Sequence, residues 1–180
     1  MSNIDIMNLK LYEPSLVLLI GVSGSGKSTF ARRHFRPTEV ISSDYCRALV
    51  CDDEADQSAT KAAFEILYLI ASRRLARRRL TVIDATNVLP SSRQPLIRLA
   101  KRHGIPLIAI VFDLSEETTQ RQNLSRANRT VAPDVIRQQS GDLRRSLMEL
   151  PREGFHQIYQ LSTSAEIENV SLEREPFEQD

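Results

Sequence analysis

The sequence predicts an α/β fold, a three-layer sandwich in which a mostly parallel central sheet lies between helices. Short apolar segments alternate with longer amphipathic ones, as repeated strand–helix–strand units require. The segments 16–20 and 106–113 are almost continuously apolar, which is typical of parallel strands buried on both faces. A glycine-rich turn joins the first of them to a helical segment. We expect one domain, 1–180, with loose termini at about 1–14 and 175–180.

Each element follows from a local pattern. Phe64, Tyr68, Ala71 and Leu75 form one apolar face of a long helix, and Ser115 is a good N-cap. The acidic segment 51–58 has no apolar period and is expected to be a loop. We expect strands at 16–20, 39–42, 80–84, 106–113 and 155–161, a frayed edge at 168–175, and helices at 27–35, 59–79, 90–102, 115–128 and 133–149.

Composition excludes some classes of protein and leaves others open. The net charge of +1 gives no overall sign of a nucleic-acid binder, and no apolar run reaches the ~18 residues of a membrane span. No export signal is visible, so Cys46 and Cys51 are expected to be reduced thiols and the protein cytoplasmic. The three histidines are scattered, so we expect no metal held by protein ligands alone.

The segment GVSGSGKS, residues 21–28, fits the phosphate-binding loop G-x-x-x-x-G-K-[ST] and stands between a strand and a helix. Its backbone amides and the helix N-terminus favour phosphate oxygens. Lys27 is expected to reach the β and γ phosphates of ATP or another NTP, and the Ser28 hydroxyl to bind Mg²⁺. The alternative is an ordinary Gly/Ser turn. The predicted nucleotide-binding residues of the loop are Gly21, Ser23, Gly24, Ser25, Gly26, Lys27, Ser28 and Thr29.

Polar residues follow the next two strands, where open α/β sheets bind ligands. Asp44 could take a proton from an attacking hydroxyl while Arg47 holds an anionic part of the acceptor, or Asp44 could simply cap a helix. Asp84 could bind a metal ion through water, or cap a turn. Asn87 and Arg93 are weaker candidates for contact with the acceptor.

Arginines cluster twice. Arg73, Arg74, Arg77, Arg78 and Arg79 end the long helix, which indicates either a solvated helix end or a nucleic-acid contact. Later in the chain, Arg126 and Arg129 share a helix face, because residues three apart differ by about 60°. They are either ordinary surface residues or part of a lid that neutralises a triphosphate. Arg121 does not share their face.

The segments GVSGSGKSTFARRHF, PTEVISSDYCRALVCDDEADQ, LTVIDATN, NLSRANRTV and REGF together resemble the kinase domain of bacterial polynucleotide kinase–phosphatase. The resemblance extends from about Leu16 to about Leu161. The phosphate-binding loop alone is shared by very many proteins, and the SSDxxR and DATN segments are more specific. The resemblance implies a P-loop kinase-like fold with an arginine-bearing helical lid.

The resemblance also implies an activity: transfer of the γ phosphate of ATP or another NTP to the 5′-hydroxyl end of RNA or DNA, with Mg²⁺ or Mn²⁺, in nucleic-acid repair. It implies that Asp44 is the general base and that Arg47 contacts the acceptor phosphate. Lys27 and Ser28 would hold the donor phosphates and the metal ion, and Arg126 and Arg129 would clamp the donor from the lid.

One departure from the family pattern concerns the lid, where Gln122 stands at the position of a further arginine, beside Arg121. Larger proteins of this family also carry phosphatase and ligase-like domains, so we expect either an excised kinase module or a stand-alone form, and a homodimer is conceivable. Two other hypotheses stay open: a P-loop kinase of small molecules, and a nucleotide-dependent ATPase or switch module without acceptor chemistry.

Overall fold

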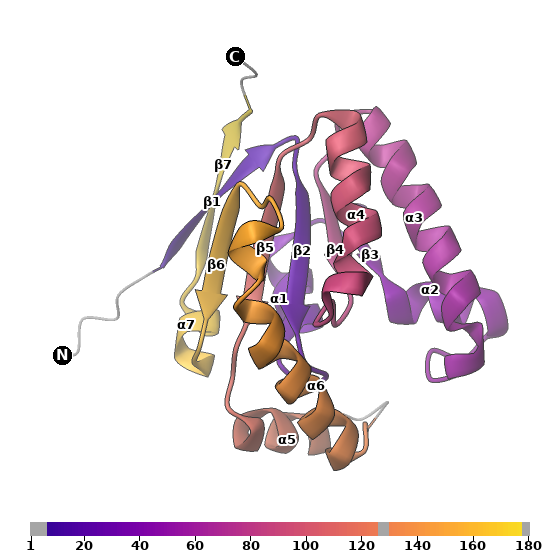
Figure 1. Ribbon diagram of the computed structural model, residues 1–180, viewed down its shortest axis with the longest axis vertical. Coiled ribbons are helices and arrows are strands. Elements are labelled where there is room, and N and C mark those ends of the chain that lie inside the picture. The colour runs from indigo at the N-terminus through magenta and orange to yellow at the C-terminus, as the bar shows by residue number, and fades with distance from the viewer. Residues whose placement is uncertain (1–6, 126–129, 178–180) are drawn as a thin grey trace.

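The computed structural model describes residues 7–125 and 130–177. Its centre is a parallel sheet of five strands in the order β3-β4-β2-β5-β6 (Figure 1). The strands are β2 (Leu16–Gly21), β3 (Val40–Ser42), β4 (Thr81–Asp84), β5 (Leu107–Phe112) and β6 (Gln157–Leu161). Every residue of β2 and β5 is buried, as their apolar runs predict. The prediction of an α/β fold with a mostly parallel sheet is confirmed.

Helices α3, α4 and α6 cover one face of this sheet. Their apolar side chains, such as Leu67, Leu96 and Ile136, pack in one cluster with Leu18 and Ile20 of β2. Helix α1 covers the other face. The helices are α1 (Lys27–His34), α2 (Ser43–Cys51), α3 (Thr60–Ala76), α4 (Pro90–His103), α5 (Glu116–Leu124), α6 (Pro133–Leu147) and α7 (Ser164–Glu168), with short 3₁₀ turns η1 (Gln57–Ala59) and η2 (Leu150–Arg152).

A second sheet of two parallel strands, β1 (Asn8–Glu13) and β7 (Ser171–Pro176), is drawn near β6 in Figure 1 and packs on the same face as α1, because Leu9 and Leu11 share a core cluster with Phe30. The prediction that the N-terminal segment is loose is therefore wrong for β1, and the frayed edge expected at 168–175 does not join the central sheet. The reason is the alternation in β1, which points Leu9 and Leu11 inward, where both are fully buried against the core.

The observed helix ends differ from the predicted ones by only a few residues. Helix α3 ends at Ala76, so the arginines at 77–79 belong to a turn rather than to the helix. Ser115 caps α5 as predicted, since its hydroxyl accepts a hydrogen bond from the Thr118 amide. Within the described part of the chain, no helix is both long enough and apolar enough to cross a bilayer.

Candidate active site

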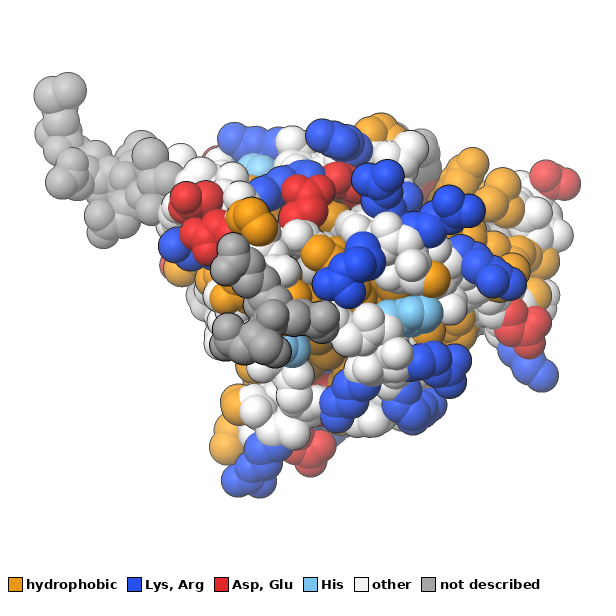
Figure 2. Space-filling view, turned by 90° about the horizontal axis from the view of Figure 1, so that it is seen from above, with side chains coloured by type: hydrophobic (Ala, Val, Ile, Leu, Met, Phe, Trp, Pro, Cys, Tyr) orange, Lys and Arg blue, Asp and Glu red, His pale blue; other side chains and the backbone are white. Residues whose placement is uncertain are grey.

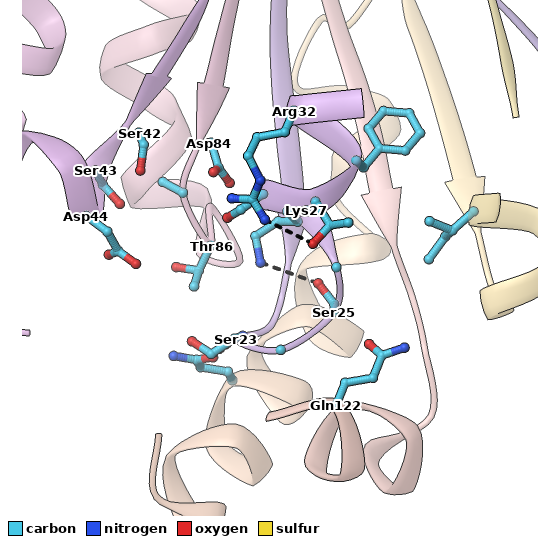
Figure 3. Close-up of a pocket in the computed structure, with 18 of the residues that line it drawn as sticks. Ser23, Ser25, Lys27, Arg32, Ser42, Ser43, Asp44, Asp84, Thr86 and Gln122 are labelled. Atoms are coloured by element: carbon cyan, nitrogen blue, oxygen red, sulfur yellow. Dashed lines mark hydrogen bonds between the residues drawn. The ribbon is translucent and has the colours of Figure 1, made fainter. Parts of the chain in front are cut away.

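A cavity of about 570 Å³ opens at the carboxyl ends of the parallel strands. The glycine-rich loop and the start of α1 form one wall, and α2 with the start of α3 forms the opposite wall (Figure 3). The carboxyl end of β4, together with residues of α5 and α6, completes the lining of the cavity. This is the place where open α/β sheets bind their ligands.

The glycine-rich loop has the geometry of a phosphate cradle. Gly26 has a φ of 90°, a left-handed conformation that glycine adopts without strain, and it precedes α1 without any side-chain cap. The first amides of α1 are therefore available to an anion. Gly24 has no room for a side chain, because a Cβ there would lie 2.8 Å from the Thr119 carbonyl oxygen. Ser23, Ser25, Ser28 and Thr29 line the cavity, whereas Gly21 ends β2 outside the lining.

Lys27 lies in this cradle and is only 7% exposed. Its Nζ donates to the carbonyl oxygen of Val22 at 2.8 Å. It also donates to Ser25 Oγ at 3.3 Å (Figure 3). The ammonium group thus stays over the loop, where it can reach a bound phosphate by a small rotation of a flexible side chain.

Asp84 ends β4 beside Ser28 and is 6% exposed. Burial raises the pKa of its carboxyl group, while the charge of Lys27 and a hydrogen bond from Ser28 oppose that shift. A hydroxyl and a carboxylate side by side are oxygen donors of the kind Mg²⁺ accepts, the carboxylate through water. These residues therefore fit a hydrated metal ion at the phosphate cradle. Among the described residues, no group of three His, Cys, Asp or Glu side chains could hold a metal ion alone.

Asp44 lies in the first turn of α2, across the cavity from the loop (Figure 3), and Arg47 follows it one turn later on the same helix and also lines the cavity. Ser42, not Asp44, caps this helix by accepting a hydrogen bond from the Tyr45 amide, so capping does not explain Asp44. Arg47 Nη1 donates to Asp44 Oδ1 at 2.8 Å and to the Glu54 carbonyl oxygen at 2.5 Å. Arg47 is 5% exposed, and its Nε has no hydrogen-bond partner among the described residues. A buried guanidinium with a spare donor beside a carboxylate suits an anionic ligand.

Two predicted acceptor-binding residues do not face the cavity, so those predictions are wrong. Arg93 is fully buried, where it binds both carboxylate oxygens of Glu153 and donates to the Asn87 carbonyl oxygen. Asn87 is 1% exposed and donates to the Leu19 carbonyl oxygen at 2.9 Å, which ties the turn after β4 to β2. Both side chains hold the scaffold beneath the site. From α4 it is Ser92 that lines the cavity.

The predicted lid arginines, Arg126 and Arg129, lie outside the described residues. Gln122 of α5 lines the cavity, while the exposed Arg121 beside it does not. A neutral amide thus lines the cavity at the α5 position where the resemblance to polynucleotide kinases predicts an arginine.

Several cavity residues were not predicted. Gln139 of α6 accepts a hydrogen bond from the Ser23 amide at 2.8 Å, so α6 holds the glycine-rich loop from outside. Arg32 and Arg33 come from the last turn of α1. No sequence motif marks these residues, because helical periodicity assigns a polar residue to a surface without saying what lies against it.

Comparisons with known proteins identify the family and the fold of this chain. The family model described as "AAA domain" matches residues 16–150. A protein of Autographa californica nuclear polyhedrosis virus, named as a bifunctional polynucleotide kinase/RNA ligase, is 27% identical over 142 residues. That match covers 69% of this chain but only 20% of the viral protein's length.

Solved structures share the fold. A chain of the Pnkp1/Rnl/Hen1 RNA repair complex superposes with a TM-score of 0.65 at 23% identity, covering 77% of this chain and 47% of that one. A gluconokinase from Sinorhizobium meliloti 1021 superposes with a TM-score of 0.53 at 19% identity, covering 86% and 85%. With three quarters of its length matched by the family model, the chain belongs to the AAA domain family, and its fold is that of the P-loop kinases.

Proposed function

We propose that this protein is a 5′-hydroxyl polynucleotide kinase, which transfers the γ phosphate of ATP or another NTP to the 5′-OH end of RNA or DNA. The observation that carries the proposal is the Asp44–Arg47 pair facing the phosphate cradle across one cavity. The names of the viral relative and of the RNA repair complex support the choice of a polynucleotide as acceptor and a role in nucleic-acid repair, beside ligase-like partners.

The residues divide the work between two walls. The loop amides and Lys27 hold the donor phosphates, and Asp44 accepts the proton of the attacking hydroxyl. Arg47 orients Asp44 and offers donors to a phosphate of the acceptor. Ser28 and Asp84 would hold Mg²⁺ or Mn²⁺, which when bound neutralises charge on the β and γ phosphates. Most of the rate enhancement then comes from positioning and charge neutralisation.

The test incubates the protein with γ-labelled ATP, Mg²⁺ and a 5′-OH oligonucleotide and measures transfer of the label to the oligonucleotide. Asp44→Asn should lower label transfer by about 10²–10⁴-fold, the range for loss of a general base, with ATP affinity nearly unchanged. Lys27→Ala should impair both ATP binding and transfer. Asp134→Asn is the matched control, an exposed aspartate in the first turn of α6 away from the cavity. Absence of transfer by the wild-type protein, with ATP binding intact, would reject the proposal.

A second candidate is a kinase of small hydroxylated metabolites, favoured by the likeness to gluconokinase over most of both chains. The same assay with gluconate and related free hydroxyl compounds separates the two. Transfer to such a compound and none to oligonucleotides would favour the second candidate.

A further inference from the structure

The end of the molecule opposite the cavity carries an exposed group of cations, which we call the distal basic surface. It lies where α3 and α4 end, at the top of Figure 1, and Figure 2 shows lysine and arginine side chains gathered on the face seen from that side. Its members are all exposed: Arg73, Arg77, Arg78 and Arg79 from the end of α3 and the turn after it, and Arg98, Lys101 and Arg102 from α4.

The two helix ends form one continuous surface. Ser72 Oγ of α3 and His103 Nε2 of α4 lie 3.4 Å apart, and Leu75 packs in the same core cluster as Ala100. No aspartate or glutamate occurs between Glu65 and Asp84, or between Asp84 and Asp113. None of the seven cations forms an ion pair with any residue in the described ranges. Their charge is therefore available to an external anion.

The turn after α3 gives an independent indication. Arg78 has a φ of 51°, a left-handed conformation that costs conformational free energy for any residue with a Cβ. Helix α4 ends in the same conformation with Gly104, at a φ of 59°, which is the usual choice. The stability of the turn thus does not account for an arginine at position 78. The exposed side chain of Arg78 adds a cation to the distal basic surface.

Helix α3 connects this surface to the cavity. Its first residues, Thr60 and Phe64, line the cavity, and its 17 residues span about 25 Å at ~1.5 Å per residue. At ~3.4 Å per phosphate along a stacked strand, a nucleic acid with its 5′ end in the cavity reaches the far end of α3 after on the order of seven nucleotides.

We propose that the distal basic surface binds the phosphodiester backbone of the acceptor strand, independently of sequence, several nucleotides downstream of the 5′ end. This inference rests on the proposed function. Because these seven cations exceed the whole-chain charge of +1, the rest of the chain has a net negative charge, and this end carries an excess of positive charge. This positive charge raises the affinity for long acceptor strands and does not contact the terminal nucleotide that reacts.

The experiment compares 5′-OH oligonucleotides of about four and about sixteen nucleotides, chosen to fall short of and beyond the ~25 Å span. The variant Arg77→Gln/Lys101→Gln/Arg102→Gln should bind the long strand at least about tenfold more weakly at low salt. Its slope of log affinity against log salt should be shallower by roughly 2, at ~0.7 per lost phosphate contact on a single strand. Its kcat/KM on the short strand should stay at the wild-type value.

Two further variants separate a contact with the strand from a loss of stability or a general loss of positive charge. Arg78→Gly removes a cation and relieves the left-handed strain, so it should weaken binding of the long strand while thermal stability holds or rises. Arg144→Gln removes an exposed cation of α6, off the path along α3, that forms no ion pair with a described residue, and it should leave the length preference unchanged.

The outcomes are distinguishable. If the short strand is phosphorylated but the triple variant keeps the wild-type affinity and salt slope for the long one, this inference is overturned and the proposed kinase stands. The inference is also overturned if these variants lose binding to anionic lipid vesicles and not to the oligonucleotide. If no strand is phosphorylated, the kinase proposal fails, whatever the salt dependence of binding.

Discussion

At the scale of one residue, the buried carboxylate of Asp84 lowers the stability of the fold that holds it. Burial raises the pKa of its carboxyl group, although the Lys27 charge and the Ser28 hydroxyl act in the other direction. A carboxyl whose pKa is higher in the folded than in the unfolded state binds its proton more tightly when folded. Its ionisation therefore lowers the free energy of unfolding as pH rises from the unfolded pKa through the raised folded one.

The substitution Asp84→Asn keeps the shape and removes the charge. In the absence of divalent metal we expect the variant to melt higher than the wild type at neutral pH, by roughly 2–4 °C for each kcal/mol of relieved burial cost. Added Mg²⁺ should raise the melting temperature of the wild type and not of the variant. Calorimetry with and without Mg²⁺ measures both. A lower melting temperature in metal-free Asp84→Asn would show that balance against Lys27 outweighs the cost of burial.

Individual residues differ in how far their sequence context reveals them. The glycine-rich loop is recognisable because its motif residues are contiguous in the sequence, and Asp44 with Arg47 because they are three residues apart on one helix. The place of Arg93 is not predictable in this way, because its partner, Glu153, is 60 residues away. An arginine near a helix start is usually solvated, and only the packed structure shows that this one is fully buried.

At the scale of elements, the Arg93–Glu153 pair joins α4 to the chain just after η2. We expect Arg93→Ala to lower the free energy of unfolding by about 3–5 kcal/mol, because it leaves the Glu153 carboxylate buried without its partner. The double variant Arg93→Met/Glu153→Leu should recover much of that loss. Chemical denaturation measures these changes. An acceptor KM raised severalfold in correctly folded Arg93→Met/Glu153→Leu would contradict a purely structural role.

Elements with a strong local pattern are predictable. Strands β2 and β5 are buried apolar runs, and α3 is a long helix with one apolar face. Strand β1 is not predictable with the same ease although Leu9 and Leu11 alternate with polar residues, since two leucines are too short a pattern to outweigh terminal position. Helix α7 has only five residues, and nothing in its composition distinguishes it from a turn.

For the whole molecule, an ion pair fixes the small sheet to the edge of the large one. The two terminal guanidinium nitrogens of Arg174 in β7, Nη1 and Nη2, donate to Glu39, just before β3, at 2.8 and 2.9 Å. Burial acts to raise the pKa of Glu39, but the hydrogen bonds from Arg174 and the Arg36 amide outweigh it and leave that pKa below its usual range. The stability that Glu39 contributes is thus present above its unfolded pKa and is lost as pH falls through the lowered folded value.

We therefore expect Arg174→Met to cost about 1–3 kcal/mol at neutral pH, the range for a hydrogen-bonded charge losing its partner. The cost should shrink on acidification below about pH 4, where glutamate becomes protonated. Urea midpoints measured across this pH range provide the check. Lys10→Met, which breaks an exposed ion pair with Glu175 in the same sheet, is the control and should change the midpoint little. A pH-independent cost for Arg174→Met would mean that lost packing, not the ion pair, dominates.

The global architecture follows from the alternation of strands and helices, because few topologies bury parallel strands on both faces. The alternation of strands and helices does not predict which distant segments come into contact. The contact of Gln139 with the Ser23 amide, and the charge accumulated where α3 and α4 end together, both depend on residues brought together only by the completed fold.

Pairing of β1 with β7 sets the order of events during biosynthesis. Asn8 opposes Ser171, so the strand made first can find its neighbour only after more than 160 further residues have left the ribosome. Until then Leu9 and Leu11 stay in contact with water or with chaperones. Closing so long a loop adds to the entropic barrier. A stalled or nicked nascent chain would therefore expose a hydrophobic N-terminal segment, which quality-control proteases can recognise.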